Sequence, residues 1–285
     1  MKKFVIVLVV LGGILNILAK EPTLELVEIW ACDPVLQTPE SVIYDPIDSL
    51  FYVSNIVGDP LAADGNGYIS QINTRGEIVQ KKWITGLNAP KGMGIYEGIL
   101  FIADLTELVE IDISTSGIIN KYPVQGAKLL NDIAVDEKGY VYISETAPDN
   151  DIIYRFRDGI TEEWHHSDYI KRPNGLYVDH GILIVGSSGT KHIAAIRLED
   201  SKVIKTVRVN TIIDGITKLD KDSYIFSDWY GKIYHLNDFK EVEQLIDLIP
   251  LKQNAADLFY SKELDLLIVP TFFNDRIRAF QIFEK

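Results

Sequence analysis

A short motif returns six times along this chain, at intervals of 40 to 51 residues. Each copy has a turn, one residue of variable chemistry and then an apolar strand. Between the copies, apolar and polar residues alternate in short runs bounded by Gly and Asp, a pattern typical of strands joined by tight turns. A repeat near forty residues with about four strands per unit is the pattern of a β-propeller blade. The six copies therefore predict six blades.

The last unit has a strand missing. After its motif it shows only three strands, near residues 257–260, 266–269 and 276–280. The apolar run Leu24–Trp30 is expected to supply the fourth strand, because this pairing closes the ring and covers two open sheet edges. The predicted fold is therefore an all-β six-bladed β-propeller. One domain over residues 20–285 is expected, with the ring closed by an N-terminal strand that completes the last blade.

Residues 1–19 have the features of a secretory signal peptide. A basic start at Met1–Lys3 precedes an apolar run over Phe4–Leu18, and the small residue Ala19 follows. The run is shorter than the roughly 20 residues that span a membrane, although an uncleaved anchor is the alternative. The sequence thus predicts an exported protein, secreted or periplasmic, that has no membrane attachment after cleavage. Cys32 is the only cysteine, so no intramolecular disulfide forms, and we expect it to be buried.

The formal net charge is −13. No basic patch balances this acidity, which argues against nucleic-acid binding. The simplest interpretation of the excess acid is solubility, and the alternative is attraction of a cation. The partner that we expect for this protein is a small-molecule substrate.

The variable residue of each motif copy is the candidate functional position. Propeller symmetry brings equivalent positions to one ring on the central axis, and four of the six are hard oxygen donors that suit Ca²⁺ or another divalent cation. No His or Cys is among them, which excludes a typical zinc site. A competing interpretation is that Asn and Asp simply favour turns before strands, but it does not account for a Glu. The six positions are Glu40, Lys91, Asn131, Asn174, Asp214 and Ala256, with Asp257 as the alternative to Ala256 in the last unit.

Four of these segments carry a family resemblance: Pro39-Glu40-Ser41-Val42, Asn131-Asp132-Ile133-Ala134-Val135-Asp136, Arg172-Pro173-Asn174-Gly175-Leu176 and Asp214-Gly215-Ile216. In order and at blade spacing, they resemble the senescence-marker-protein/gluconolactonase/luciferin-regenerating-enzyme family of six-bladed propellers. Paraoxonases and diisopropylfluorophosphatase are more distant relatives. In that family a Glu, one or two Asn and an Asp bind a divalent cation, usually calcium. The resemblance implies that Glu40, Asn131, Asn174 and Asp214 are metal ligands here.

The resemblance also implies a function, metal-dependent hydrolysis of a lactone or related ester. The cation would polarise the substrate carbonyl. Asp214 would act as the general base or hold a water on the metal, and Asn131 would also orient the substrate. The alternative from another class is a non-catalytic propeller that binds a ligand or protein partner at its channel face. A metal-free lyase or synthase is a third interpretation.

Lys91 departs from the family pattern. One interpretation makes it a substrate-binding or acid-catalytic group beside the metal. A second is that its charge neutralises Glu40 and Asp214, so that no metal binds. A third is that Lys91 points away and Gly92 lines the pocket. In the metal-free lyase, Lys91 would be the catalytic group.

Two further features have simpler interpretations. The residues that end the second strand of each unit are expected to satisfy backbone N–H groups between blades. These strand-end residues are Asn55, Asp104, Glu145, Ser187, Asp228 and Thr271.

The insertion from Asn55 to Gly67 in the first unit is expected to cap the pocket, because long insertions on one face often carry binding.

Overall fold

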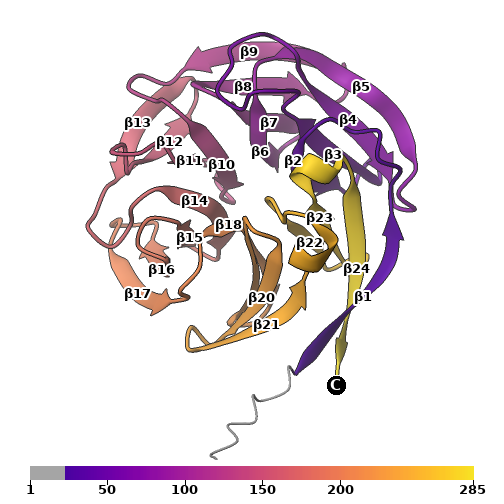
Figure 1. Cartoon of the computed structure of the whole chain (residues 1–285). Helices are drawn as coiled ribbons and strands as arrows, with labels where there is room; N and C mark the ends of the chain where they lie inside the picture. The colour runs from indigo at the N-terminus through magenta and orange to yellow at the C-terminus, as the bar shows by residue number, and fades with distance from the viewer. Residues whose placement is uncertain (1–22) are drawn as a thin grey trace, which may run out of the picture.

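The computed structural model describes residues 23–285, which form six four-stranded antiparallel sheets around a central axis (Figure 1). The predicted all-β six-bladed propeller is therefore confirmed. In this described range the helical segments are two 3₁₀ turns, η1 (Ile249–Leu251) and η2 (Phe272–Asn274). None of its helices is long and apolar enough to cross a membrane. The predicted signal peptide, residues 1–19, lies outside the described residues.

Five blades follow chain order from the axis outward. Blade 1 contains β2 (Pro39–Asp45), β3 (Leu50–Asn55), β4 (Gly67–Asn73) and β5 (Ile78–Leu87). Blade 2 contains β6 (Pro90–Tyr96), β7 (Ile99–Asp104), β8 (Glu107–Asp112) and β9 (Gly117–Pro123). Blade 3 contains β10 (Leu130–Val135), β11 (Val141–Glu145), β12 (Ile153–Arg157) and β13 (Ile160–His165). Blade 4 contains β14 (Pro173–Asp179), β15 (Ile182–Ser187), β16 (His192–Arg197) and β17 (Val203–Arg208). Blade 5 contains β18 (Ile213–Asp220), β19 (Ser223–Asp228), β20 (Lys232–Asn237) and β21 (Glu241–Asp247).

The sixth blade joins the two ends of the described chain. It contains β22 (Phe259–Ser261), β23 (Leu266–Pro270), β24 (Ile277–Glu284) and, as its outer strand, β1 (Leu24–Ala31). β1 pairs antiparallel with β24, as predicted, and Figure 1 shows the indigo strand beside the yellow one. Thr23 also reaches the neighbouring blade, where its N and Oγ1 donate to Glu243 at 3.0 and 2.6 Å. β1 therefore closes the ring, and Glu243 holds its beginning against blade 5.

The core consists of apolar layers between adjacent blades, because alternate residues of each strand face the neighbouring sheet. The layer between blades 6 and 1 includes Phe51, Ile268 and Cys32, with Trp30 packed against it. Cys32 is buried, as expected. The Trp30 indole N–H donates to Thr74 O at 3.1 Å, and its ring lies 6.2 Å from that of Phe51. Trp30 thus joins the closing strand to blade 1.

Gly76 is packed against the face of Trp30. Its φ is +82°, and a Cβ atom there would lie 2.5 Å from Trp30 Cε3. We expect Gly76→Ala to lower the free energy of unfolding by about 2–4 kcal/mol, from backbone strain and overpacking together. Urea unfolding followed by circular dichroism measures this. Gly86→Ala is the control, since Gly86 has a similar φ of +79° but open space around it. Equal losses in both variants would show that the Trp30 contact contributes nothing.

The ends of the second strands hold the connections between blades in place. Asp104 Oδ1 accepts from the N–H groups of Asn88 and Ala89 at 2.9 and 2.7 Å. Glu145 accepts from the N–H groups of Lys128 and Leu129 at 2.8 and 2.9 Å. These bonds confirm the expected backbone role for these two carboxylates.

Candidate metal centre on the propeller axis

The inner strands bring the six predicted ring residues to the propeller axis. Neighbouring inner strands contact one another around a closed circle, from β2 through β6, β10, β14 and β18 to β22 and back to β2. In the first five of these strands the pairing register shifts between the first and fourth residues of the motif, so each ring residue lies in an irregular strand start. All six side chains are 8% exposed or less. The structure therefore gathers the whole predicted set in a buried position.

Each of the four predicted metal ligands has one buried oxygen without a hydrogen-bond partner. Seven buried side-chain polar atoms lack a partner in the described chain, and four belong to this set: Glu40 Oε2, Asn131 Oδ1, Asn174 Oδ1 and Asp214 Oδ2. An unpaired buried polar group costs about 1–3 kcal/mol, so such groups require an explanation. The four atoms are all acceptors, and a cation satisfies acceptors without supplying a hydrogen. The donor set thus fits a hard divalent cation.

One hydrogen bond within the ring orients two of these ligands. Asn174 Nδ2 donates to Asp214 Oδ1 at 2.8 Å. This bond occupies the side-chain N–H₂ group of Asn174 and one carboxylate oxygen of Asp214. Asn174 Oδ1 and Asp214 Oδ2 are left as the unpartnered atoms.

Buried carboxylates crowd the centre. Burial raises the pKa of Glu40 well above its usual value, and the charges of Asp214 and Asp257 raise it further. Burial and Asp257 also raise the pKa of Asp214 to about 7, although the Asn174 hydrogen bond opposes this shift. Both pKa values rise because the carboxylates are poorly solvated and lie near other negative charges. The charge of Lys91 opposes the shift of Glu40.

Lys91 lies on the ring but does not pair with a carboxylate. Its Nζ donates to Ala89 O at 2.9 Å and to Pro60 O at 3.3 Å. Among residues 23–285 it forms no ion pair within 4.0 Å, so it makes no direct contact with the charges of Glu40 or Asp214. Burial lowers the pKa of Lys91, and Glu40 opposes that shift. The ammonium instead links the β3–β4 loop, residues 56–66, to the residue that precedes β6 through these two carbonyl groups.

Two carboxylates lie one residue after a ring position: Asp132, which the sequence reasoning missed, and Asp257, which it left as the alternative to Ala256. Asp132 Oδ2 accepts from Leu176 N at 2.6 Å, and Asp257 Oδ2 accepts from Ser41 Oγ at 2.6 Å. These bonds connect blade 3 to blade 4 and blade 6 to blade 1. The signal was present in the third residue of each motif copy, which is Ser or Gly in four copies and Asp in these two. In blade 6 the charge that acts on Glu40 is therefore that of Asp257, while Ala256 packs in an apolar cluster.

An aliphatic layer lies beyond the ring along the inner strands. Its six side chains occupy equivalent positions and are each 3–4% exposed: Val42, Met93, Ile133, Leu176, Ile216 and Leu258. They line a cavity of about 220 Å³ together with Asp132 and Asp257, and no ring residue lines it. The layer separates that cavity from the ring.

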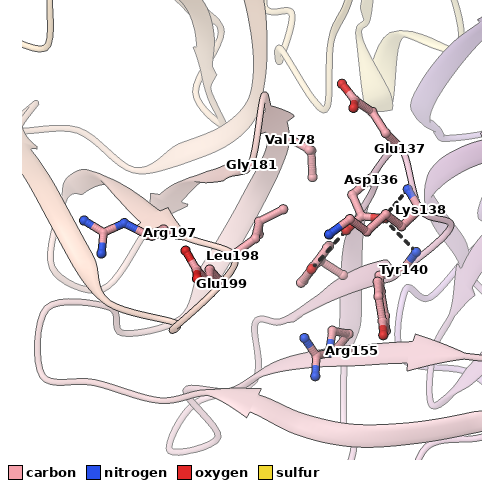
Figure 2. Close-up of a pocket in the computed structure, with 11 residues that line it drawn as sticks. Asp136, Glu137, Lys138, Tyr140, Arg155, Val178, Gly181, Arg197, Leu198 and Glu199 are labelled. Carbon is pink, nitrogen blue, oxygen red and sulfur yellow. Dashed lines mark hydrogen bonds between the residues drawn. The ribbon is translucent and has the colours of Figure 1, made fainter.

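A larger hollow of about 490 Å³ lies between blades 3 and 4 (Figure 2). Asp136 on its wall accepts from the N–H groups of Lys138 and Tyr140, both at 2.9 Å, so this carboxylate organises a turn. Arg155 lies over the Tyr140 ring and pairs with Glu162. No ring residue lines this hollow, and its charged groups have structural partners in these cases. The axis remains the candidate site.

No group of three or more His, Cys, Asp and Glu side chains in the described part of the chain is placed to hold a metal. The ring itself has two carboxylates, Glu40 and Asp214. Its other two oxygens belong to the amides of Asn131 and Asn174. Amide oxygens are ordinary calcium ligands, so the ring offers four oxygen donors of the kind that calcium binds.

Solved structures share this architecture. A catalytically inactive His-to-Ala variant of virginiamycin B lyase from Staphylococcus aureus, determined with quinupristin, is 15% identical, with a TM-score of 0.62 over 90% of this chain and 98% of that one. A streptogramin B lyase structure is 13% identical, with a TM-score of 0.66 over 91% and 97%. At these identities the likeness establishes the six-bladed fold alone. No family model and no curated protein sequence matches the chain. The gluconolactonase-type resemblance therefore stays a prediction from motifs.

Proposed function

We propose that Glu40, Asn131, Asn174 and Asp214 hold a divalent cation, most suitably Ca²⁺, in an exported hydrolase of a lactone or related ester. The observation that carries the proposal is the set of four unpartnered acceptor oxygens, one from each of these residues. Calcium takes six to eight oxygen ligands, so four protein oxygens would leave positions for water and substrate. The position of Lys91 supports the proposal, because its hydrogen bonds go to backbone carbonyls and leave the two carboxylates free.

The chain's own groups suit this chemistry. A cation bound by the four residues would polarise a carbonyl and stabilise developing negative charge on its oxygen. Asn174 holds the carboxylate of Asp214 in one orientation, which favours a ligand or water-holding role for Asp214. Asn131 also carries an amide N–H₂ group that would orient a substrate oxygen. The aliphatic layer of Val42 and its five equivalents limits access of water from the far side.

The lyase neighbours suggest a different reaction, and one observation weighs against it. In the virginiamycin B lyase structure, a His-to-Ala change gives a catalytically inactive protein. Here His165 bonds to Ser201 O and Ser167, and His235 bonds to Ser223 and Glu243, away from the axis. No ring position is a histidine. We place hydrolysis ahead of elimination because the four unpartnered acceptor oxygens suit a cation that polarises a carbonyl.

A second candidate is a propeller whose axial cation only stabilises the blades, with binding but no catalysis at the channel face. The observation that favours it is burial, because all six ring residues are 8% exposed or less and the β3–β4 loop contacts Lys91. Turnover separates the two candidates, since both bind calcium.

The test starts with calcium titration by calorimetry on metal-stripped protein that begins at Lys20. We expect one calcium to bind per chain. A panel of lactones and aryl esters is then assayed with calcium and with chelator, and we expect hydrolysis that chelator abolishes. Calcium binding without hydrolysis would favour the structural cation. A folded protein that binds no calcium would overturn the proposal.

Lys91→Met is expected to retain calcium binding, with unchanged or higher affinity, because it removes a positive charge near Glu40. The free energy of unfolding should fall by about 1–3 kcal/mol, since Ala89 O and Pro60 O lose a donor. Calorimetry and urea unfolding measure both effects, with Lys218→Met, which breaks an ion pair to Asp179, as the control. Loss of calcium binding in folded Lys91→Met would contradict the expectation. A large fall in kcat with calcium bound would assign Lys91 the predicted catalytic role.

A further inference from the structure

The axial cavity beyond the ring combines an apolar wall with two carboxylates. Its volume is about 220 Å³, and the whole aliphatic layer lines it together with Asp132 and Asp257. This volume is below the roughly 300–1,000 Å³ of pockets for drug-sized ligands. The four predicted metal ligands do not line it. The cavity is therefore a separate candidate site, of a size that suits a small molecule.

The cavity opens at the end where the inner strands finish. The aliphatic layer is 3–4% exposed, whereas Ile43, Val135 and Val178 of the same lining are half-buried. Val135 and Val178 also line a neighbouring hollow of about 580 Å³, which reaches exposed turn residues such as His180. A small molecule can therefore reach the cavity from this end of the propeller, opposite to the ring.

Hydrogen bonds hold the two carboxylates in fixed orientations. Asp132 accepts from Ile133 N and Leu176 N, both at 2.6 Å, and Asp257 Oδ2 accepts from Ser41 Oγ at 2.6 Å. A carboxylate has about four acceptor positions, so each group can accept a further hydrogen bond. Among residues 23–285 neither carboxylate has a Lys, Arg or His partner within 4.0 Å. A ligand that carries donors and positive charge would complete both groups.

Glycines of adjacent blades make room for these carboxylates. A Cβ atom at Gly92 would lie 2.4 Å from Asp132 Oδ1, and a Cβ atom at Gly215 would lie 2.4 Å from Asp257 Oδ1. Asp132 belongs to blade 3 and Asp257 to blade 6, so they lie three blades apart in a ring of six. The third residue of the motif thus places two carboxylates on opposite sides of one axial space.

We propose that this cavity binds a small primary alkylammonium ion, with the ammonium group at Asp132 and Asp257 and the alkyl chain against the aliphatic layer. An ammonium group has three donors and no acceptor, which complements two carboxylates. A buried charge is costly unless it is paired and hydrogen-bonded, and these carboxylates supply both. Each methylene buried against the aliphatic layer adds to the affinity. The inference does not rest on calcium or on hydrolysis at the ring.

The lining argues against other ligand classes. An anion would lie beside two carboxylates, and a neutral alcohol would leave them without a counter-charge. A bare divalent cation requires about six oxygen ligands, whereas most of this lining is aliphatic. The net charge of −13 also favours the approach of a cation.

Met93 allows a direct test, because its side chain lines the cavity and it is the only methionine in a protein that begins at Lys20. A carbon-13 label on the methionine methyl group gives one NMR signal from this place. The probes are hexylamine, 1-hexanol, hexanoate and methylamine, each titrated with excess calcium at neutral pH, where an alkylamine is protonated. We expect hexylamine to shift the Met93 signal to saturation and to bind about tenfold or more tightly than each other probe.

Substitutions locate the ammonium group. Asp257→Asn preserves the size of the side chain and an oxygen for Ser41, and it should reduce the preference for hexylamine over 1-hexanol to about threefold or less. Asp132→Asn provides the same measurement if Asp257→Asn does not fold. Asp220→Asn is the matched control, because Asp220 lines the neighbouring hollow and not the cavity, and it should leave the preference unchanged.

The outcomes separate this inference from the proposed function. An unshifted Met93 signal, equal binding of hexylamine and 1-hexanol, or an unchanged preference in the folded Asp257→Asn or Asp132→Asn protein would overturn the inference. If calcium does not bind but the hexylamine preference depends on Asp257, the amine site is supported and the hydrolase proposal fails. If calcium binds and hexylamine shows no preference, the hydrolase proposal survives and the amine site does not.

Discussion

Replacing Glu40 by Gln, or Asp214 by Asn, is expected to lower calcium affinity by about a hundredfold or more, because each change leaves only one anionic ligand on the ring. Both substitutions preserve the size of the side chain, so the propeller should stay folded. Calcium at about a hundred times its dissociation constant should stabilise the wild-type protein by about 2.7 kcal/mol. This stabilisation should disappear in both variants. Calorimetry and calcium-dependent thermal unfolding measure these two effects.

In the calcium-free protein, we expect these substitutions to have the opposite effect on stability. Burial and the charges of Asp214 and Asp257 disfavour ionised Glu40, so removing the ionisable group relieves repulsion in the folded state. We expect calcium-free Glu40→Gln to be at least as stable as the wild type at neutral pH. Asp179→Asn is the matched control, because Asp179 pairs with Lys218 outside the ring, and it should leave calcium binding unchanged. Wild-type calcium affinity in Glu40→Gln would rule out the ring as the site.

Removing the closing strand is expected to have the largest effect on folding. A chain that starts at Cys32 lacks β1, which pairs with β24 from Leu24 to Ala31, and it loses Trp30 from the layer between blades 6 and 1. Such a chain leaves the edge of β24 open, and open edges promote aggregation. We expect loss of the cooperative unfolding transition and formation of oligomers. Circular dichroism during urea unfolding and analytical ultracentrifugation measure these outcomes.

A chain that starts at Lys20 is the control for this deletion and should remain a cooperative folding unit. A synthetic peptide of residues 23–31 added to the shortened chain should restore part of the transition, because a peptide strand can pair with an exposed sheet edge. A shortened chain that unfolds like the control would show that pairing of β1 with β24 is dispensable for stability.

Most of the fold could be predicted from local patterns. The alternation within each strand and the recurrence of one motif predict six blades, because each blade repeats the same local interactions. The completion of blade 6 by Leu24–Trp30 followed from counting strands, and the β1–β24 pairing confirms it. The ring of Glu40, Asn131, Asn174 and Asp214 was predictable for the same reason, since symmetry places equivalent residues together. Its occupation by calcium stays a prediction.

Such patterns do not predict contacts between residues that are far apart in the sequence. The six repeats, the closing strand and the identity of the residues on the axis were predictable because they depend on periodicity and symmetry. Three-dimensional contacts were needed to show that the Lys91 ammonium donates to Pro60 O and Ala89 O, and that Asp132 and Asp257 connect adjacent blades. The same kind of contact packs Phe272 in one apolar cluster with Ala256. These outcomes depend on side-chain direction and on loops that break the repeat, so no periodic pattern encodes them.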